Sequence, residues 1–115
     1  MIAGIGVDIT SIKRFEGKER RFYERILSPS ELKEDISAEY VASRFAAKEA
    51  FSKALGTGIR GFSLKDVAVE EDEMGKPFLT FSGRAAEKVS GLSFHLSLSH
   101  DGSLAVAFVV AEHAQ

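Results

Sequence analysis

Three charged side chains have unusually small neighbours, and together they fit a metal-assisted phosphate site. Asp8 would share one strand face with Gly4 and Gly6, where missing side chains let a ligand or another backbone reach its carboxylate. Glu49 and Lys53 stand one helical turn apart. If Asp8 and Glu49 meet in space, they form the hard oxygen site that Mg²⁺ uses together with substrate phosphates and waters.

Each of these signals also has an ordinary structural explanation. A strand-end aspartate commonly hydrogen-bonds to the following turn, and a Glu–Lys pair four residues apart is commonly a solvated ion pair. The charges of Arg44, Lys48 and Lys53 would suit phosphates, but Arg44 and Lys48 lie on a different side of the helix from Glu49. A neighbouring subunit could supply the positive charges that one chain cannot direct at the same ligand.

His100 precedes a tight-turn sequence, so its imidazole could donate to a phosphate or transfer a proton. A turn histidine without a function explains the position equally well. We expect His95 at the surface and His113 in a frayed tail, and assign neither a role.

The sequence matches none of three other motifs for phosphate binding or nucleophilic catalysis. Residues 4–6 lack the third glycine of a dinucleotide fingerprint, and residues 56–58 lack the lysine of a P-loop. Residues 99–101, Ser-His-Asp, are consecutive and point in different directions, so they form no catalytic triad.

The elements that must position these residues follow from periodicity. Residues 4–9 predict a strand with its aliphatic side chains inward and its glycines and Asp8 on the other face. Residues 37–55 predict the main helix, with Ser37 as N-cap and Gly56 just past its end. One side of that helix carries small residues, which leave room for another group to approach the helix closely.

The second half of the chain predicts strands. Residues 67–70 and 77–81 form an expected hairpin, and residues 83–90 a short helix. Strands are expected over 92–99 and 104–110; the latter is apolar on both faces and therefore central. We predict an α+β fold: a mostly antiparallel sheet packed against one long helix and shorter helices, in a single domain over residues 1–115.

Composition narrows the function classes. The 115 residues carry 15 Lys and Arg against 17 Asp and Glu, so no global positive field favours nucleic acid or an anionic membrane. The absence of cysteine excludes disulfides, thiolate zinc sites and a cysteine nucleophile. The chain shows neither a signal-peptide pattern nor an apolar run long enough to cross a bilayer, so we expect a cytoplasmic protein.

Three motifs occur together and in order: GIGVDI at 4–9, RFAAKEAFSKA at 44–54 and SLSH at 97–100. This combination resembles the bacterial holo-acyl-carrier-protein synthases, which are small single-repeat phosphopantetheinyl transferases. Further matches at 12–15, 56–58 and 75–77 extend the resemblance over nearly the whole chain.

The resemblance implies that 4′-phosphopantetheine is transferred from coenzyme A to a serine of apo-acyl-carrier protein. Adenosine 3′,5′-bisphosphate is released, Mg²⁺ is the cofactor, and the reaction serves fatty acid biosynthesis. Asp8 and Glu49 would hold the metal against the coenzyme A pyrophosphate, and Lys53 and His100 would contact phosphates. The general base stays open among Glu49, Asp8 through a water, and a neutral Lys53.

The resemblance assigns further contacts. Arg44 would contact a phosphate, Lys76 and Pro77 would lie near the adenine, and Arg14 would receive the acidic recognition helix of the carrier protein. Such proteins resemble homotrimers with coenzyme A bound between adjacent subunits. The segment 31–44 is shorter than its counterpart in the family, so different loop packing is expected there.

Two other functions fit part of the pattern. A non-catalytic oligomer could bind coenzyme A or a carrier protein, and its binding would survive metal removal. A Mg²⁺-dependent phosphohydrolase would release phosphate or nucleotide without an acceptor protein. Transfer differs from both because it needs the metal, Glu49 and the acceptor together.

Overall fold

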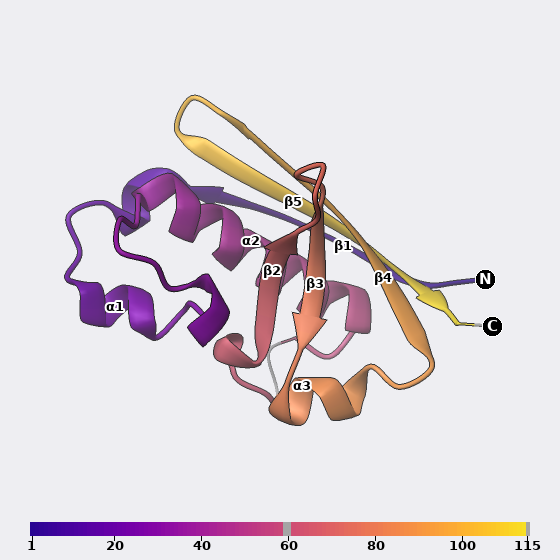
Figure 1. Cartoon of the computed structure of the whole chain (residues 1–115). Helices are drawn as coiled ribbons and strands as arrows, with labels where there is room; N and C mark the ends of the chain where they lie inside the picture. The colour runs from indigo at the N-terminus through magenta and orange to yellow at the C-terminus, as the bar shows by residue number, and fades with distance from the viewer. Residues whose placement is uncertain (59–60, 115) are drawn as a thin grey trace.

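The fold consists of two antiparallel sheets with one long helix between them (Figure 1). This computed structural model describes residues 1–58 and 61–114. In chain order the elements are β1 (Ile2–Ser11), η1 (Ile12–Phe15), α1 (Arg20–Glu24), η2 (Pro29–Glu31), α2 (Ala38–Leu55), η3 (Leu64–Asp66), β2 (Val67–Glu71), β3 (Pro77–Phe81), α3 (Gly83–Lys88), β4 (Leu92–Asp101) and β5 (Leu104–His113). The α+β prediction is confirmed.

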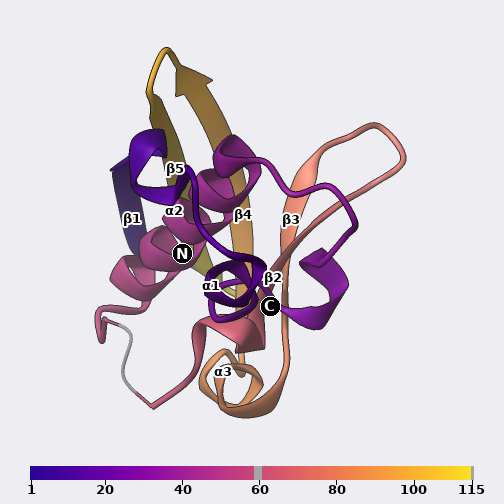
Figure 2. The same ribbon diagram turned by 90° about the vertical axis from the view of Figure 1, so that its left-hand side faces the viewer.

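The larger sheet has the strand order β1-β5-β4, with both pairings antiparallel. The central position predicted for the last strand is therefore confirmed. β2 and β3 form a separate two-stranded sheet, as the hairpin prediction requires. In Figure 2, the tip of this hairpin projects away from the larger sheet.

Helix α2 has the ends that its sequence predicts. The Ser37 hydroxyl accepts a hydrogen bond of 3.0 Å from the Tyr40 backbone N–H. Gly56 adopts a left-handed conformation with φ of 80°, and its N–H donates to the carbonyls of Ser52 and Lys53. These caps fix the length of the helix and therefore the positions of the charged residues along it.

The predicted orientation of β1 is wrong. Ile5, Val7 and Ile9 are 61%, 52% and 61% exposed, and the opposite face of the strand packs on α2. A Cβ atom at Gly6 would collide with the carbonyl oxygen of Ala50, and one at Gly4 with that of Ala54. The glycines therefore admit the backbone of α2, so the close neighbour that their small size predicted is this helix.

Aromatic residues fill the space between α2 and the two sheets. The ring of Phe51 lies 4.9 Å from that of Phe81 and 5.2 Å from that of Phe94, measured between centroids. A second cluster, which includes Phe15, Tyr23 and Leu27, covers the N-terminal half of α2. Burial on both sides fixes the rotation of α2, and hence which of its side chains meet β1.

The C-terminal segment is more ordered than expected. β5 continues to His113, which pairs with Leu92 of β4. The backbone N–H of His113 also donates to the Met1 carbonyl oxygen at 3.0 Å. The prediction of a frayed tail containing His113 is wrong because both neighbouring strands continue to this end of the sheet.

Candidate active site

Asp8 and Lys53 meet where β1 crosses α2. The Lys53 ammonium lies 3.3 Å from Oδ1 of Asp8 and donates a 2.9 Å hydrogen bond to the backbone oxygen of Val7. The Asp8 side chain is only 15% exposed, whereas that of Lys53 is 52% exposed. Lys53 thus pairs with the strand, and about half of its side chain still faces solvent.

Glu49 belongs to the same group of charges. Burial is the main cause that raises the pKa of Glu49, and the nearby Asp8 charge raises this pKa further. The charges of Lys53 and Arg14 act in the opposite direction. The charge of Asp8 is thus one cause acting on the pKa of Glu49, and a shared metal site of the two carboxylates stays a prediction.

Arg14 lies at the end of this group, on η1. Its guanidinium donates to Oγ1 of Thr10 at 3.2 Å and lies 5.2 Å from the centroid of the Phe45 ring. Its influence on the pKa of Glu49 places its charge within electrostatic range of that carboxylate.

Lys48 is not available to a phosphate, contrary to the suggestion from its charge. Its side chain is fully buried, and its ammonium lies 2.6 Å from Oε1 of Glu31 and 2.6 Å from the Ile26 carbonyl oxygen. Glu31 also accepts hydrogen bonds from the backbone N–H groups of Ser28 and Val69. This network ties α2 to η2 and β2, which explains why a charged pair is tolerated in the interior.

Arg44 and His100, called the second group, each contact a residue in the N-terminal part of α2. The Arg44 guanidinium donates to the Ser43 hydroxyl at 2.9 Å, and Nε2 of His100 lies 3.3 Å from Oε1 of Glu39. As predicted, Arg44 does not share the helix face of Glu49. The structure therefore separates the expected phosphate contacts into two groups.

Lys76 and Pro77 lie where the turn after β2 enters β3. Pro77 begins β3, and the backbone N–H of Lys76 donates to the Asp72 carboxylate at 2.9 Å. The same aspartate accepts a 2.9 Å bond from the backbone N–H of Met74, so its side chain shapes the tight hairpin. The Lys76 ammonium is thereby presented from a fixed turn.

Sequence reasoning did not single out Tyr40 and Lys33. The Tyr40 ring contacts the Arg44 guanidinium, whose carbon lies 4.1 Å from the ring centroid. Lys33 approaches the same ring from the segment before α2. The four-residue spacing of Tyr40 and Arg44 could have indicated the first contact, but only the folded loop shows the second.

The site has few candidate metal ligands. Across residues 1–58 and 61–114, no three His, Cys, Asp or Glu side chains gather in a group able to hold a metal ion. Asp8 and Glu49 would supply two carboxylates, which matches the way Mg²⁺ combines one or two carboxylates with substrate phosphates and water. None of the helices in these ranges is long and apolar enough to span a membrane.

Comparison with known proteins places this arrangement in a family. The sequence model described as the 4′-phosphopantetheinyl transferase superfamily matches residues 4–109, which include both groups of charged residues. The chain belongs to this superfamily. The relationship expected from the three sequence motifs is confirmed.

Several relatives are similar to this chain over almost its whole length. It is 44% identical to the holo-[acyl-carrier-protein] synthase of Treponema denticola, over 97% of this chain and 99% of that protein. The crystal structure of the Neisseria meningitidis synthase superposes with a TM-score of 0.89 at 40% identity, covering 97% of this chain and 99% of that one. The Bacillus anthracis synthase, described in complex with coenzyme A (3′,5′-ADP), gives 0.83 at 45% identity and covers 99% of both chains.

Proposed function

We propose that this transferase moves the 4′-phosphopantetheine group of coenzyme A to a serine hydroxyl of apo-acyl-carrier protein. The observation that carries the proposal is the Asp8–Glu49–Lys53 group, in which Lys53 lies 3.3 Å from Asp8 and the Asp8 charge raises the pKa of Glu49. The similarity to holo-[acyl-carrier-protein] synthases over nearly the full chain supports the substrate assignment. The reaction belongs to fatty acid biosynthesis in the cytoplasm.

The reaction replaces a phosphoanhydride bond of coenzyme A with a phosphoester bond to serine. The serine oxygen forms a bond to the phosphorus that carries the pantetheine arm, and the bond from that phosphorus to the bridging pyrophosphate oxygen breaks. Adenosine 3′,5′-bisphosphate leaves, and the serine proton passes to a base. The candidate bases are the two carboxylates of the group, Glu49 and, through a water, Asp8.

Lys53 acts as a cation in this proposal. Its ammonium donates to the Val7 carbonyl and pairs with Asp8, contacts that hold its position. A fixed ammonium stabilises the negative charge that develops on the phosphoryl oxygens, because it needs little reorganisation during the reaction. Its half-exposed end leaves it accessible to the coenzyme A pyrophosphate.

Asp8 and Glu49 would hold Mg²⁺ against the pyrophosphate. The donor set fits this ion, since two carboxylates leave positions for phosphate oxygens and water. When bound, the cation supplies charge stabilisation to the pyrophosphate. The repulsion between two adjacent carboxylates, which is one cause of the raised pKa of Glu49, would also be relieved.

We further propose that coenzyme A binds between subunits of a homotrimer. Arg44 and His100 are grouped away from Asp8 and Glu49, and Lys76 and Pro77 lie on a different sheet. A neighbouring copy could bring its Arg44 and His100 to the Asp8–Glu49–Lys53 group of this chain. The Lys76–Pro77 turn would then lie beside the adenine. Arg14, on η1, would receive the acidic helix of the carrier protein.

The outer face of the larger sheet supports the trimer. Four large apolar side chains on the adjacent strands β1 and β5 expose between 42% and 61% of their surface: Ile5, Val7, Ile9 and Phe108. In the antiparallel register Val7 is opposite Phe108, so these side chains form one continuous apolar patch. Burying such a patch against equivalent patches of two further copies would remove apolar surface from water.

Product analysis distinguishes the proposal from its alternatives. With coenzyme A, Mg²⁺ and apo-acyl-carrier protein, the transferase should release adenosine 3′,5′-bisphosphate only when the acceptor serine is present. A carrier protein with that serine replaced by alanine is the matched control. Release without an acceptor would identify a phosphohydrolase, and binding without release would identify a non-catalytic binding protein.

A further inference from the structure

The guanidinium of Arg14 contacts side chains from two other elements. Its Nη1 atom donates to Oγ1 of Thr10 on β1 at 3.2 Å, and the guanidinium carbon lies 5.2 Å from the centroid of the Phe45 ring on α2. The same carbon lies 5.5 Å from the ring centroid of Phe15, the next residue of η1. Both ring distances are within the range in which an aromatic ring attracts a cation. Three contacts therefore hold the guanidinium, although Arg14 is an exposed residue.

Thr10 is a rigid partner for this exposed arginine. Only 4% of Thr10 is exposed, and it pairs with Ala105 of the central strand β5. A β-branched side chain has few rotamers, so the Thr10 hydroxyl has a fixed position. Thr10 follows Asp8 by two residues, and alternate residues of a strand share one face. The position of the Arg14 guanidinium is thus tied to the strand that carries Asp8.

Arg14 keeps hydrogen-bonding capacity for a ligand. Among the residues that the structure describes, no carboxylate forms an ion pair with Arg14. A guanidinium has five N–H donors in a planar fork, and the bond to Thr10 uses one of them. Such a fork matches a carboxylate, which can accept two parallel hydrogen bonds. The contacts of Arg14 therefore fix its orientation without neutralising its charge.

We propose that Thr10 is a positioning residue for the carrier protein: with the Phe45 ring, its hydroxyl holds the Arg14 guanidinium in the orientation that binds a carboxylate of that partner. The inference rests on the proposed function, in which Arg14 receives the acidic helix of the carrier protein. A guanidinium that is already held loses less conformational entropy when the partner binds. Because Thr10 and Asp8 share one strand face, the same contact aligns the bound carrier protein with Asp8.

Calorimetry of apo-acyl-carrier protein binding, without coenzyme A, tests the role of the hydroxyl. Thr10→Val removes the hydroxyl but keeps the branched shape, and it should raise the Kd about threefold to tenfold. Thr10→Ser keeps the hydroxyl and should bind as the wild type does. Thr80→Val removes a hydroxyl that donates to Glu70 on the smaller sheet, and this control should leave the Kd unchanged. The Tm of Thr10→Val should stay close to that of the wild type, because valine suits a strand and the exposed Arg14 can donate to water.

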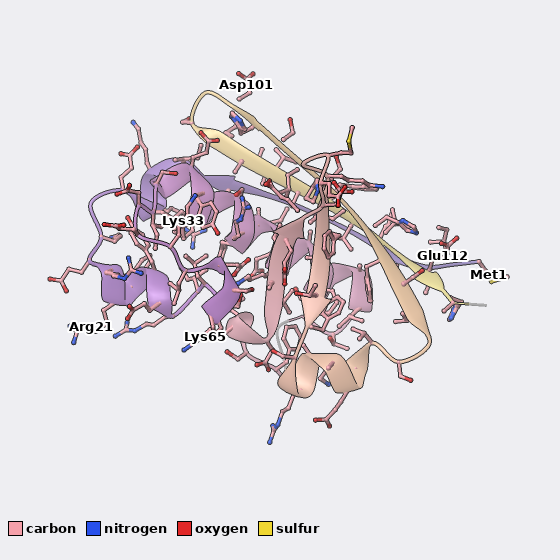
Figure 3. All side chains as sticks on the ribbon, in the orientation of Figure 1. Met1, Arg21, Lys33, Lys65, Asp101 and Glu112 are labelled. Atoms are coloured by element: carbon pink, nitrogen blue, oxygen red, sulfur yellow. The ribbon has the colours of Figure 1, made fainter. Side chains whose placement is uncertain are left out.

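The order of the Arg14 side chain can be measured with no carrier protein present. NMR relaxation of its Nε–H group, assigned by the loss of the signal in Arg14→Lys, should show a restrained side chain in the wild type and in Thr10→Ser. The same group should be mobile in Thr10→Val. Arg21, whose side chain is 78% exposed and projects from α1 in Figure 3, provides a mobile reference in the same spectra.

An unchanged Kd in Thr10→Val, or an Arg14 side chain as ordered there as in the wild type, would overturn the inference. A loss of binding in Thr10→Val that Thr10→Ser does not restore to the wild-type level would also overturn it. A wild-type chain that binds no carrier protein, while Arg14 becomes mobile in Thr10→Val, would contradict the proposed function and still support the positioning of Arg14 by Thr10.

Discussion

The ammonium of Lys53 lies 3.3 Å from the carboxylate of Asp8, although the two residues are 45 positions apart in the chain. This contact depends on the close crossing of β1 and α2, which Gly4 and Gly6 permit. The same crossing brings Glu49 into electrostatic contact with Asp8. The proposed active site therefore depends on Gly4 and Gly6, whose lack of side chains lets β1 approach α2 closely.

Gly6→Ala should damage both the fold and the site. The added Cβ would collide with the Ala50 carbonyl oxygen, and backbone atoms of α2 cannot move aside cheaply. We expect a loss of about 3 kcal/mol in the free energy of unfolding, measured with urea. Ala3→Ser, which adds one atom at an exposed position of the same strand, is the control. Equal stability of the two variants would contradict the close β1–α2 packing.

Glu49→Gln should stabilise the fold at neutral pH while abolishing transfer. The pKa of Glu49 in the folded state is raised above the reference value of 4.5 that applies to the unfolded state. Between the unfolded-state pKa and the folded-state pKa, the folded state therefore binds more protons than the unfolded state. Stability therefore falls as pH rises through that window, and the penalty is fully present above it. Glutamine removes the penalty, so Tm should rise at pH 7.5.

The pH dependence supplies the control for this variant. At a pH well below 4.5, the wild-type carboxyl is protonated in both states, and the gain in Tm from Glu49→Gln should disappear. Transfer at neutral pH should fall by at least about a hundredfold. A constant difference in Tm across this pH range would show that the ionisation of Glu49 is not its cause.

The position of α2 could be predicted from the sequence, because its caps are local. Ser37 and Gly56 are recognisable without any tertiary contact, and both end the helix as expected. The direction in which β1 faces could not be read in the same way. Its aliphatic side chains are exposed, and period-2 alternation alone does not say which face meets the core.

Some of the site residues could likewise be predicted from the local sequence, and others could not. Asp8, Glu49 and Lys53 were found from residue type and motif, and the structure brings Lys53 to Asp8. The charge of Lys48 suggested a phosphate contact, but its partner Glu31 comes from another segment and buries it. Long-range pairing of this kind leaves no periodic signal in the sequence.

Lys48→Met should be strongly destabilising. The replacement leaves the buried Glu31 carboxylate without its cationic partner, and we expect a loss of about 3 to 5 kcal/mol in unfolding free energy. Adding Glu31→Gln should recover part of that loss, because the unpaired charge is removed. A double-mutant cycle of urea unfolding measures the coupling, and additive effects of the two changes would contradict the pairing.

Phe108→Glu should dissociate the proposed trimer. Phe108 is 42% exposed in the apolar patch opposite Val7, and a carboxylate there would be buried on assembly. Light scattering should give three chain masses for the wild type and one for the variant, whose transfer activity should also fall at least tenfold. Met74→Glu, at a 90% exposed position in the β2–β3 hairpin, should remain trimeric. A fully active wild-type monomer would exclude a site shared between subunits.

Intact-protein mass spectrometry of apo-acyl-carrier protein tests the central claim most directly. The chain is incubated with this acceptor, coenzyme A and Mg²⁺, beside samples containing EDTA or the Glu49→Ala variant. We predict that the acceptor gains the mass of one phosphopantetheine group, and that both controls abolish the gain. An unmodified acceptor across several carrier proteins, with coenzyme A still bound to the wild-type chain, would contradict the transferase and favour a binding protein.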